Sequence, residues 1–132
     1  MSLEIEARIT SSQGQLLLIA WFEGSSAARL VMTGPDGERE EIQINKISAS
    51  LQDDVVEVLR ESIMPEAKSP TGLTAKLQVN TERQRVGRAV HLGGRQTQAD
   101  QLCSKLIAMA TLMAKDEGVK RSLEVVKQHL SS

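Results

Sequence analysis

The longest apolar stretch of the chain is Leu16-Leu17-Leu18-Ile19-Ala20-Trp21-Phe22. These seven residues fall far short of the roughly 20 that a membrane-spanning helix needs. No polar residue alternates with the apolar ones, a pattern typical of a strand that is buried on both faces. The run therefore predicts a central strand of a sheet, covered on its two sides.

The residues on either side of this run continue the strand-rich pattern. Before it, apolar and polar residues alternate over residues 3–10, which is the period of a half-buried strand. After it, residues 28–32 repeat the alternation. The turn signal Gly34-Pro35-Asp36-Gly37 then precedes a strand around residues 42–44. The first third of the chain thus predicts a four-stranded antiparallel meander.

A helix and two further strands follow the meander. Ser50 and Asp53 have the spacing of a capping box, and apolar residues continue at helical spacing as far as Ile63. Alternating residues then predict a fifth strand over residues 73–79 and a sixth over residues 86–92.

Two helices complete the predicted fold. Thr97 and Asp100 form a second capping box at the start of a very apolar helix, which we expect to be covered on two sides. A last helix covers residues 119–130, and we favour two helices separated near Gly118 over one long helix. The sequence predicts a single α+β domain over residues 1–132, in the order ββββαββαα, with an antiparallel sheet packed by helices on one side.

The composition is that of a globular domain. The chain has 132 residues, of which 40% are hydrophobic and 25% are charged. With one Trp, one Phe and no Tyr, its core must be aliphatic. Single-stranded nucleic acids usually stack on exposed aromatic residues, and we expect at most one of Trp21 and Phe22 to face solvent. The N-terminus has no signal-peptide pattern, and the single Cys103 excludes an internal disulfide. We therefore expect a cytoplasmic protein without a membrane segment.

The charges are unevenly distributed along the chain. Residues 1–64 contain eleven acidic and five basic residues, whereas residues 65–132 contain six acidic and eleven basic ones. Such polarity indicates either a charged partner or opposite charges that face each other within a monomer or across a homodimer. We favour pairing within the protein.

No catalytic or metal-binding signature is present. The sequence lacks a phosphate-binding glycine loop, a nucleophile elbow and a His-Glu-x-x-His helix. His91 and His129 have no metal-ligand spacing with each other or with Cys103, which we interpret as a small buried hydrophobe. We expect no catalytic residue, no metal and no cofactor, and hence a protein that is not an enzyme.

Two sets of residues are candidates for binding a protein partner. Asp53, Glu57 and Glu61 recur every four residues and form an acidic ridge on the first helix, either solvated or a docking surface for a basic partner. In the apolar helix that starts at Thr97, the candidates are Ile107, Met109 and Met113. Methionine side chains adapt to varied surfaces, which suits an interface between two copies of the chain.

A basic segment is the third candidate. It contains Lys76, Arg83, Arg85, Arg88 and Arg95. Arginine side chains bind phosphate oxygens in a bidentate manner, so this segment could contact a nucleic-acid backbone. Arg83 and Arg85 are expected on one face of a strand and Arg88 on the other, and the overall pI of about 6.1 argues against nucleic-acid binding.

These observations favour a non-enzymatic protein-interaction module that acts as a homodimer. Adaptors, small chaperones and assembly subunits belong to this class. The alternative is a nucleic-acid-binding accessory protein that uses residues 83–95.

Overall fold

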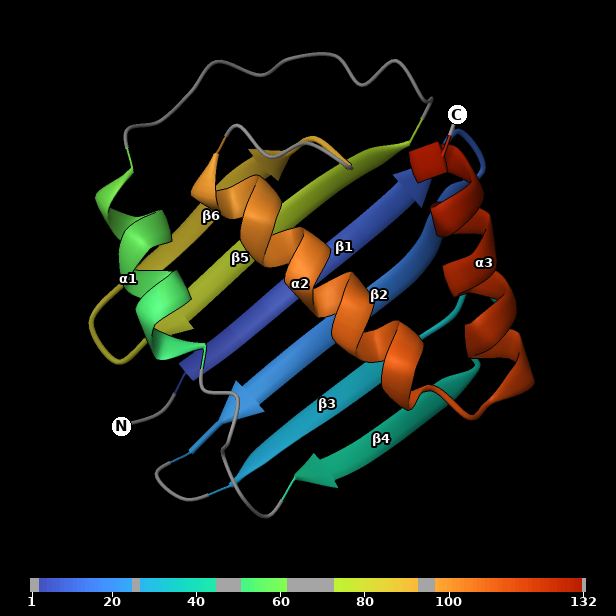
Figure 1. Cartoon of the computed structure of the whole chain (residues 1–132), viewed down its shortest axis with the longest axis horizontal. Helices are drawn as coiled ribbons and strands as arrows, with labels where there is room; N and C mark the ends of the chain where they lie inside the picture. The colour runs from blue at the N-terminus through green and yellow to red at the C-terminus, as the bar shows by residue number, and fades with distance from the viewer. Residues whose placement is uncertain (1–2, 25–26, 45–50, 62–72, 93–96, 132) are drawn as a thin grey trace.

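Six antiparallel strands form one sheet over the residues that the computed structural model describes, and three helices cover one face of this sheet (Figure 1). The described residues are 3–24, 27–44, 51–61, 73–92 and 97–131. In chain order the elements are β1 (Leu3–Ser11), β2 (Gly14–Glu23), β3 (Ala28–Thr33), β4 (Arg39–Ile44), α1 (Gln52–Arg60), β5 (Thr74–Thr81), β6 (Arg85–Val90), α2 (Gln98–Met113) and α3 (Glu117–Ser131). The predicted α+β fold and its element order are confirmed.

The order of strands across the sheet is β4-β3-β2-β1-β5-β6, and each neighbouring pair is antiparallel. Strands β1 to β4 form the predicted meander, whereas β5 pairs with the remaining side of β1. This arrangement places β1 and β2 in the middle of the sheet. It leaves β4 and β6 as the two edge strands of the described sheet.

Alternate residues of the central strands form the core beneath the helices. Ile5 of β1 lies opposite both Trp21 of β2 and Val79 of β5, and all three side chains are buried. Helix α2 crosses the middle of the sheet between α1 and α3 (Figure 1), where it buries Leu102 and Leu106. Among the described residues this core is aliphatic apart from Trp21 and Cys103, as the composition predicts.

The outer face of β2 is covered differently from the prediction. All three helices lie on the other side of the sheet (Figure 1), so no described helix protects this face. Instead, the Arg29 guanidinium lies 4.6 Å from the centroid of the Phe22 ring and forms a 3.3 Å ion pair with Glu41. Val31, two residues from Arg29 and opposite Glu41, is only 7% exposed. Long polar side chains thus cover the face for which a second packed layer was predicted.

The first predicted helix is confirmed, but its predicted cap is not observed. Helix α1 ends at Arg60, and its N-cap residue is Leu51, whose side chain makes no capping hydrogen bond. The predicted cap Ser50 and the predicted end Ile63 lie outside the described residues. At the second predicted capping box, Thr97 Oγ1 accepts the Asp100 N–H at 3.0 Å, which confirms the start of α2.

Two separate helices end the chain, as predicted. The Asp116 side chain accepts the Val119 N–H at 3.1 Å and caps α3. The boundary between the two helices therefore lies before Gly118 rather than at it. Gly118 lies in the first turn of α3, where a Cβ atom would come within 2.4 Å of Glu38 Cγ. A larger residue at this position would therefore have to displace the Glu38 side chain of the β3–β4 turn.

Candidate protein-interaction site

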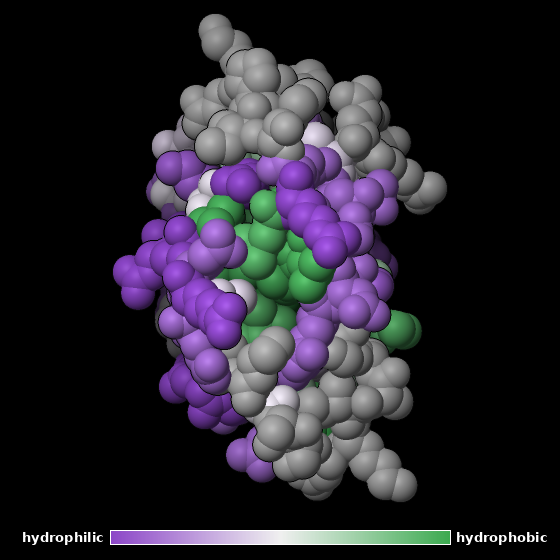
Figure 2. Space-filling view, turned by 90° about the vertical axis from the view of Figure 1, so that its left-hand side faces the viewer, coloured by the Kyte–Doolittle hydropathy of each residue, from purple (hydrophilic) through white to green (hydrophobic). Residues whose placement is uncertain are grey.

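A pocket opens between α1 and the turn that joins β5 to β6. Its volume is about 510 Å³, and it is lined by Leu3, Gln52, Asp53, Val55, Val56, Leu59, Thr81, Glu82, Arg83 and Gln84. On this side of the molecule a hollow of hydrophobic side chains is surrounded by hydrophilic ones (Figure 2). Val56, which lines the pocket, is 42% exposed. We call this feature the α1 pocket.

The three residues of the predicted acidic ridge have different roles in the structure. Asp53 lines the α1 pocket, whereas Glu57 forms an exposed ion pair of 3.7 Å with Arg60. Glu61 is part of the scaffold, because its carboxylate accepts the Gln98 N–H at 2.8 Å and the Ala99 N–H at 3.4 Å. Glu61 therefore caps the start of α2, and the three residues do not form one free docking surface.

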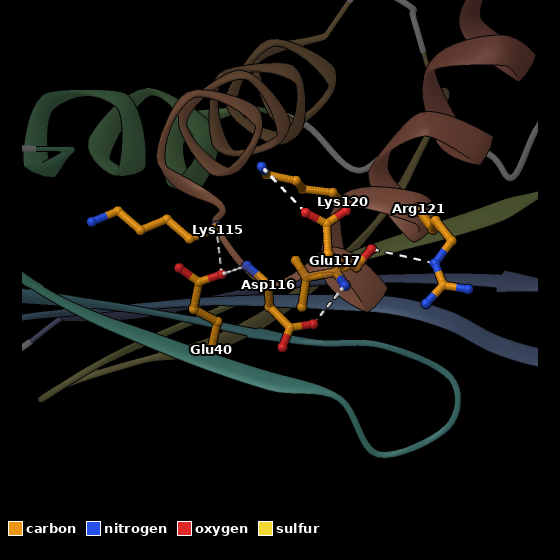
Figure 3. A network of polar contacts seen from close by, with 7 residues as sticks. Glu40, Lys115, Asp116, Glu117, Lys120 and Arg121 are labelled. Atoms are coloured by element: carbon orange, nitrogen blue, oxygen red, sulfur yellow. Dashed lines mark hydrogen bonds and ion pairs between the residues drawn. The ribbon is translucent and has the colours of Figure 1, made fainter.

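A second carboxylate holds the other end of α2. The Glu40 side chain of β4 accepts the backbone N–H groups of Lys115 and Asp116, each at 2.7 Å (Figure 3). These two residues connect α2 to α3. Lys105 also forms a 2.9 Å ion pair with Asp54, which joins a basic residue of the second half to an acidic residue of the first. The other ion pairs, Arg29–Glu41, Arg39–Glu41, Arg60–Glu57 and Lys120–Glu117, each lie within one half of the chain. Pairing of the two oppositely charged halves within the protein therefore stays a prediction.

The sequence analysis did not identify the buried carboxylate of Glu23 as a structural residue. Glu23 at the end of β2 is only 2% exposed, and its Oε1 accepts the Trp21 Nε1–H at 3.2 Å and the Leu51 N–H at 3.1 Å. It thus joins the central strand to the start of α1, the helix that forms one wall of the α1 pocket. In the sequence Glu23 only marks the end of an apolar run, so no local pattern indicates this role.

The residues predicted on α2 differ in their accessibility. Ile107 is 5% exposed and belongs to the core, whereas Met109 and Met113 are partly buried. Leu112, between the two methionines in sequence, is 87% exposed. Sequence analysis missed Leu112 because the whole helix is apolar, so hydrophobic spacing alone does not show which side faces water.

The predicted basic segment is not a single surface. Lys76 lies on β5 opposite Arg8 of β1, on the face of the sheet without helices. Arg85 of β6 lies opposite Asn80, which is on the same face of β5 as Lys76, so Arg85 is also on the face without helices. Arg88 lies opposite the buried Leu77 and therefore on the helix side, as the alternation predicts. Arg83 lies in the β5–β6 turn rather than on the strand. Arg95 lies outside the described residues.

Few of these cations are neutralised by the protein. Within the part of the chain that the structure describes, no carboxylate forms an ion pair with Lys76, Arg83, Arg85 or Arg88. Arg88 donates to the carbonyl oxygen of Gly87 at 3.0 Å, and its Nε is buried without a hydrogen-bond partner. Of the four, only Arg83 lines the α1 pocket, where the acidic Asp53 and Glu82 lie in the same lining.

The remaining reactive side chain is buried in the core. Burial raises the pKa of the Cys103 thiol from 9.0 to about 12, and the negative charge of Asp100 acts in the same direction. The thiol is therefore protonated and shielded near neutral pH. No group of three metal-ligating side chains occurs among the described residues, and none of the described helices is long and apolar enough to cross a membrane.

Comparisons with other proteins add no assignment. No protein-family model matches the sequence, and no curated protein matches it significantly.

Proposed function

We propose that the protein is a non-enzymatic interaction module that binds a segment of a partner protein in the α1 pocket. The exposed apolar surface of this pocket carries the proposal. An apolar hollow with a polar rim is characteristic of binding sites, and a volume of about 510 Å³ lies within the usual range for them. An adaptor, a small chaperone or an assembly subunit would use such a surface.

The surroundings of the pocket support this role. One wall is a helix whose start is fixed by the buried Glu23, and the opposite wall is a tight turn closed by the Thr81 N–H and the Gln84 carbonyl oxygen at 2.8 Å. Because both walls are held by hydrogen bonds, the site is largely preformed, which lowers the entropic cost of binding.

Photo-crosslinking tests this proposal directly. A photoreactive amino acid replaces Val56. A matched control replaces Leu112, which is also exposed but does not line the pocket, and from which we expect no adduct other than one between two copies of the chain. We expect a discrete cross-linked protein from position 56 in cells of the natural source, lost when Leu59→Asp is added. The absence of any protein adduct at position 56 would refute the proposal.

Homodimer formation is a second part of the proposal. It is supported by the exposed Leu112 beside the partly buried Met109 and Met113. The dimer surface would therefore lie on the outer side of α2.

Nucleic-acid binding is the alternative function, favoured by one observation. Arg8 and Lys76 are direct cross-strand neighbours on the open sheet face, and no described carboxylate pairs with either of them. Like charges in this position destabilise a sheet unless an anion neutralises them. Against this function, Glu4 and Glu6 of β1 share the same face.

A salt titration decides this alternative. Binding of a labelled oligonucleotide should weaken steeply with salt, and Lys76→Ala combined with Arg85→Ala should reduce both the affinity and the salt dependence. Binding that is undetectable at low salt, or unchanged in the double variant, would reject a role for this surface.

A further inference from the structure

The α1 pocket is lined by charged residues of both signs. They are Asp53 of α1 and Glu82 and Arg83 of the β5–β6 turn. Glu82 has an interaction partner within the protein. Asp53 and Arg83, in contrast, form no ion pair and no side-chain hydrogen bond with any described residue. The lining therefore offers one carboxylate and one guanidinium to a ligand.

The other charged side chains at α1 already contribute to the fold. Asp54 pairs with a lysine of α2 at 2.9 Å, and Glu57 pairs with Arg60 at 3.7 Å. Glu61 accepts backbone N–H groups at the start of α2. Among the described charges of this helix and its end, Asp53 alone lines the pocket without a partner.

The remaining lining includes a continuous part of the apolar core. Leu3 and Val55 are buried, whereas Val56 and Leu59 of the same lining are still accessible to water. They belong to the side of the molecule on which Figure 2 shows a hydrophobic hollow with a hydrophilic rim. An apolar side chain of a ligand would cover this surface, and removal of apolar surface from water is the main source of affinity.

A ligand that covers the pocket also removes water from Asp53 and Arg83. An ionised group that loses water without gaining a partner costs free energy. A ligand with only basic groups would neutralise Asp53 and repel Arg83, and a ligand with only acidic groups would do the reverse. A ligand that carries both signs neutralises both residues.

We propose that the α1 pocket binds a segment of a partner protein in which one apolar side chain lies between a basic and an acidic side chain. This inference rests on the proposed function, because it names the ligand of the same pocket. The apolar side chain supplies most of the affinity, the basic one pairs with Asp53, and the acidic one pairs with Arg83. Because both protein charges are exposed, these pairs add little affinity and mainly select among ligands.

Four synthetic peptides of the form Gly-X-Gly-Phe-Gly-Z-Gly test the need for both charges. The pair X and Z is Lys and Glu, Lys and Lys, Glu and Glu, or Gln and Gln. Binding is followed through the NMR signals of the Val56 and Leu59 methyl groups, with Leu112 as a control outside the pocket. We expect the Lys and Glu peptide to bind at least about threefold more tightly than each of the others. Equal binding of the Lys and Glu peptide and the Gln peptide would overturn the proposal.

Two charge reversals test the assignment of the residues. Asp53→Lys leaves two free positive charges in the lining and should make the peptide with two Glu residues the tightest ligand. Arg83→Glu leaves two free negative charges and should favour the peptide with two Lys residues. The control Arg39→Glu changes an exposed arginine outside the pocket and should keep the original ranking.

The same measurements separate this inference from the proposed function. If no peptide shifts the methyl signals, or if both reversals keep the original ranking, the inference is wrong. The proposed function still stands in that case when position 56 gives a discrete protein adduct. If position 56 gives no adduct either, both fail.

Discussion

The carboxylate of Glu61 accepts the backbone N–H of Gln98 at 2.8 Å, so a residue that follows α1 caps the start of α2. The same principle recurs at the other helices: Glu23 accepts the Leu51 N–H before α1, and Glu40 accepts the Lys115 and Asp116 N–H groups before α3. A negative charge at a helix N-terminus also interacts favourably with the helix dipole. Carboxylates from distant parts of the chain therefore fix all three helices to the sheet or to each other.

The first prediction concerns this remote cap. Replacing Glu61→Ala leaves the Gln98 and Ala99 N–H groups without their acceptor and should lower the free energy of unfolding by about 1–2 kcal/mol. The matched control Glu57→Ala removes only an exposed ion pair and should change it by less than about 0.5 kcal/mol. Urea denaturation measures both values, and equal losses would show that Glu61 is an ordinary surface residue.

The second prediction is that the effect of Gly118→Ala on stability changes sign when Glu38 is replaced. Gly118→Ala places a Cβ atom where Glu38 Cγ would be 2.4 Å away, so the substitution should destabilise the protein. In the Glu38→Ala background the closest contacts are absent and only Asp116 Oδ1, at 3.2 Å, remains near the new Cβ atom, so the same substitution should stabilise α3 by up to about 1 kcal/mol. A double-mutant cycle of thermal unfolding provides the coupling energy. Identical effects in the two backgrounds would contradict the close approach seen here.

The third prediction concerns the pH dependence of stability. The pKa of the Cys103 thiol is about 12 in the folded protein against an ordinary value of 9.0, so its contribution is fully present below pH 9. Above pH 9 the unfolded thiol ionises and the folded thiol does not, so stability is lost by up to about 1.4 kcal/mol per pH unit as the pH approaches 12. Comparing denaturation of the unmodified protein with Cys103→Ala from pH 8 to 11 isolates this effect. Parallel curves for the two proteins would show that the thiol is accessible to water.

The fourth prediction concerns the oligomeric state. If the outer side of α2 joins two copies, Leu112→Asp should convert a dimer into a monomer in size-exclusion chromatography with light scattering, because it places charge in an apolar contact. Val56→Asp serves as the control and should leave the dimer intact. If the unmodified protein is a monomer at micromolar concentration, the proposed homodimer is wrong.

Much of the fold is predictable from local patterns in the sequence. The alternation over residues 3–10 and the box of Thr97 and Asp100 are local signals, and the corresponding strand and helix start are observed. The run over residues 16–22 predicts a central strand correctly but not its covering, because Arg29 and Glu41 are brought over it only by strand pairing.

The candidate site depends more strongly on tertiary structure. Asp53 and Glu61 both belong to the predicted acidic ridge, and their spacing in the sequence does not distinguish them. In the structure Asp53 lines the α1 pocket, whereas Glu61 caps α2 by accepting the N–H of Gln98, 37 residues further along the chain. The pocket itself combines Val56 of α1 with Arg83 of a distant turn. Neither residue alone indicates a binding surface, since an exposed valine and a turn arginine are common in any globular protein.

The most direct test of the central claim is a comparison of dissociation constants. Peptides enriched on the unmodified protein from a random displayed library are measured by anisotropy against that protein, Val56→Asp and Leu112→Asp. Both substitutions replace an exposed apolar residue, so both variants should fold. The α1 pocket predicts binding at least about tenfold weaker for Val56→Asp and unchanged for Leu112→Asp. Equal binding to all three proteins, or a loss confined to Leu112→Asp, would contradict it.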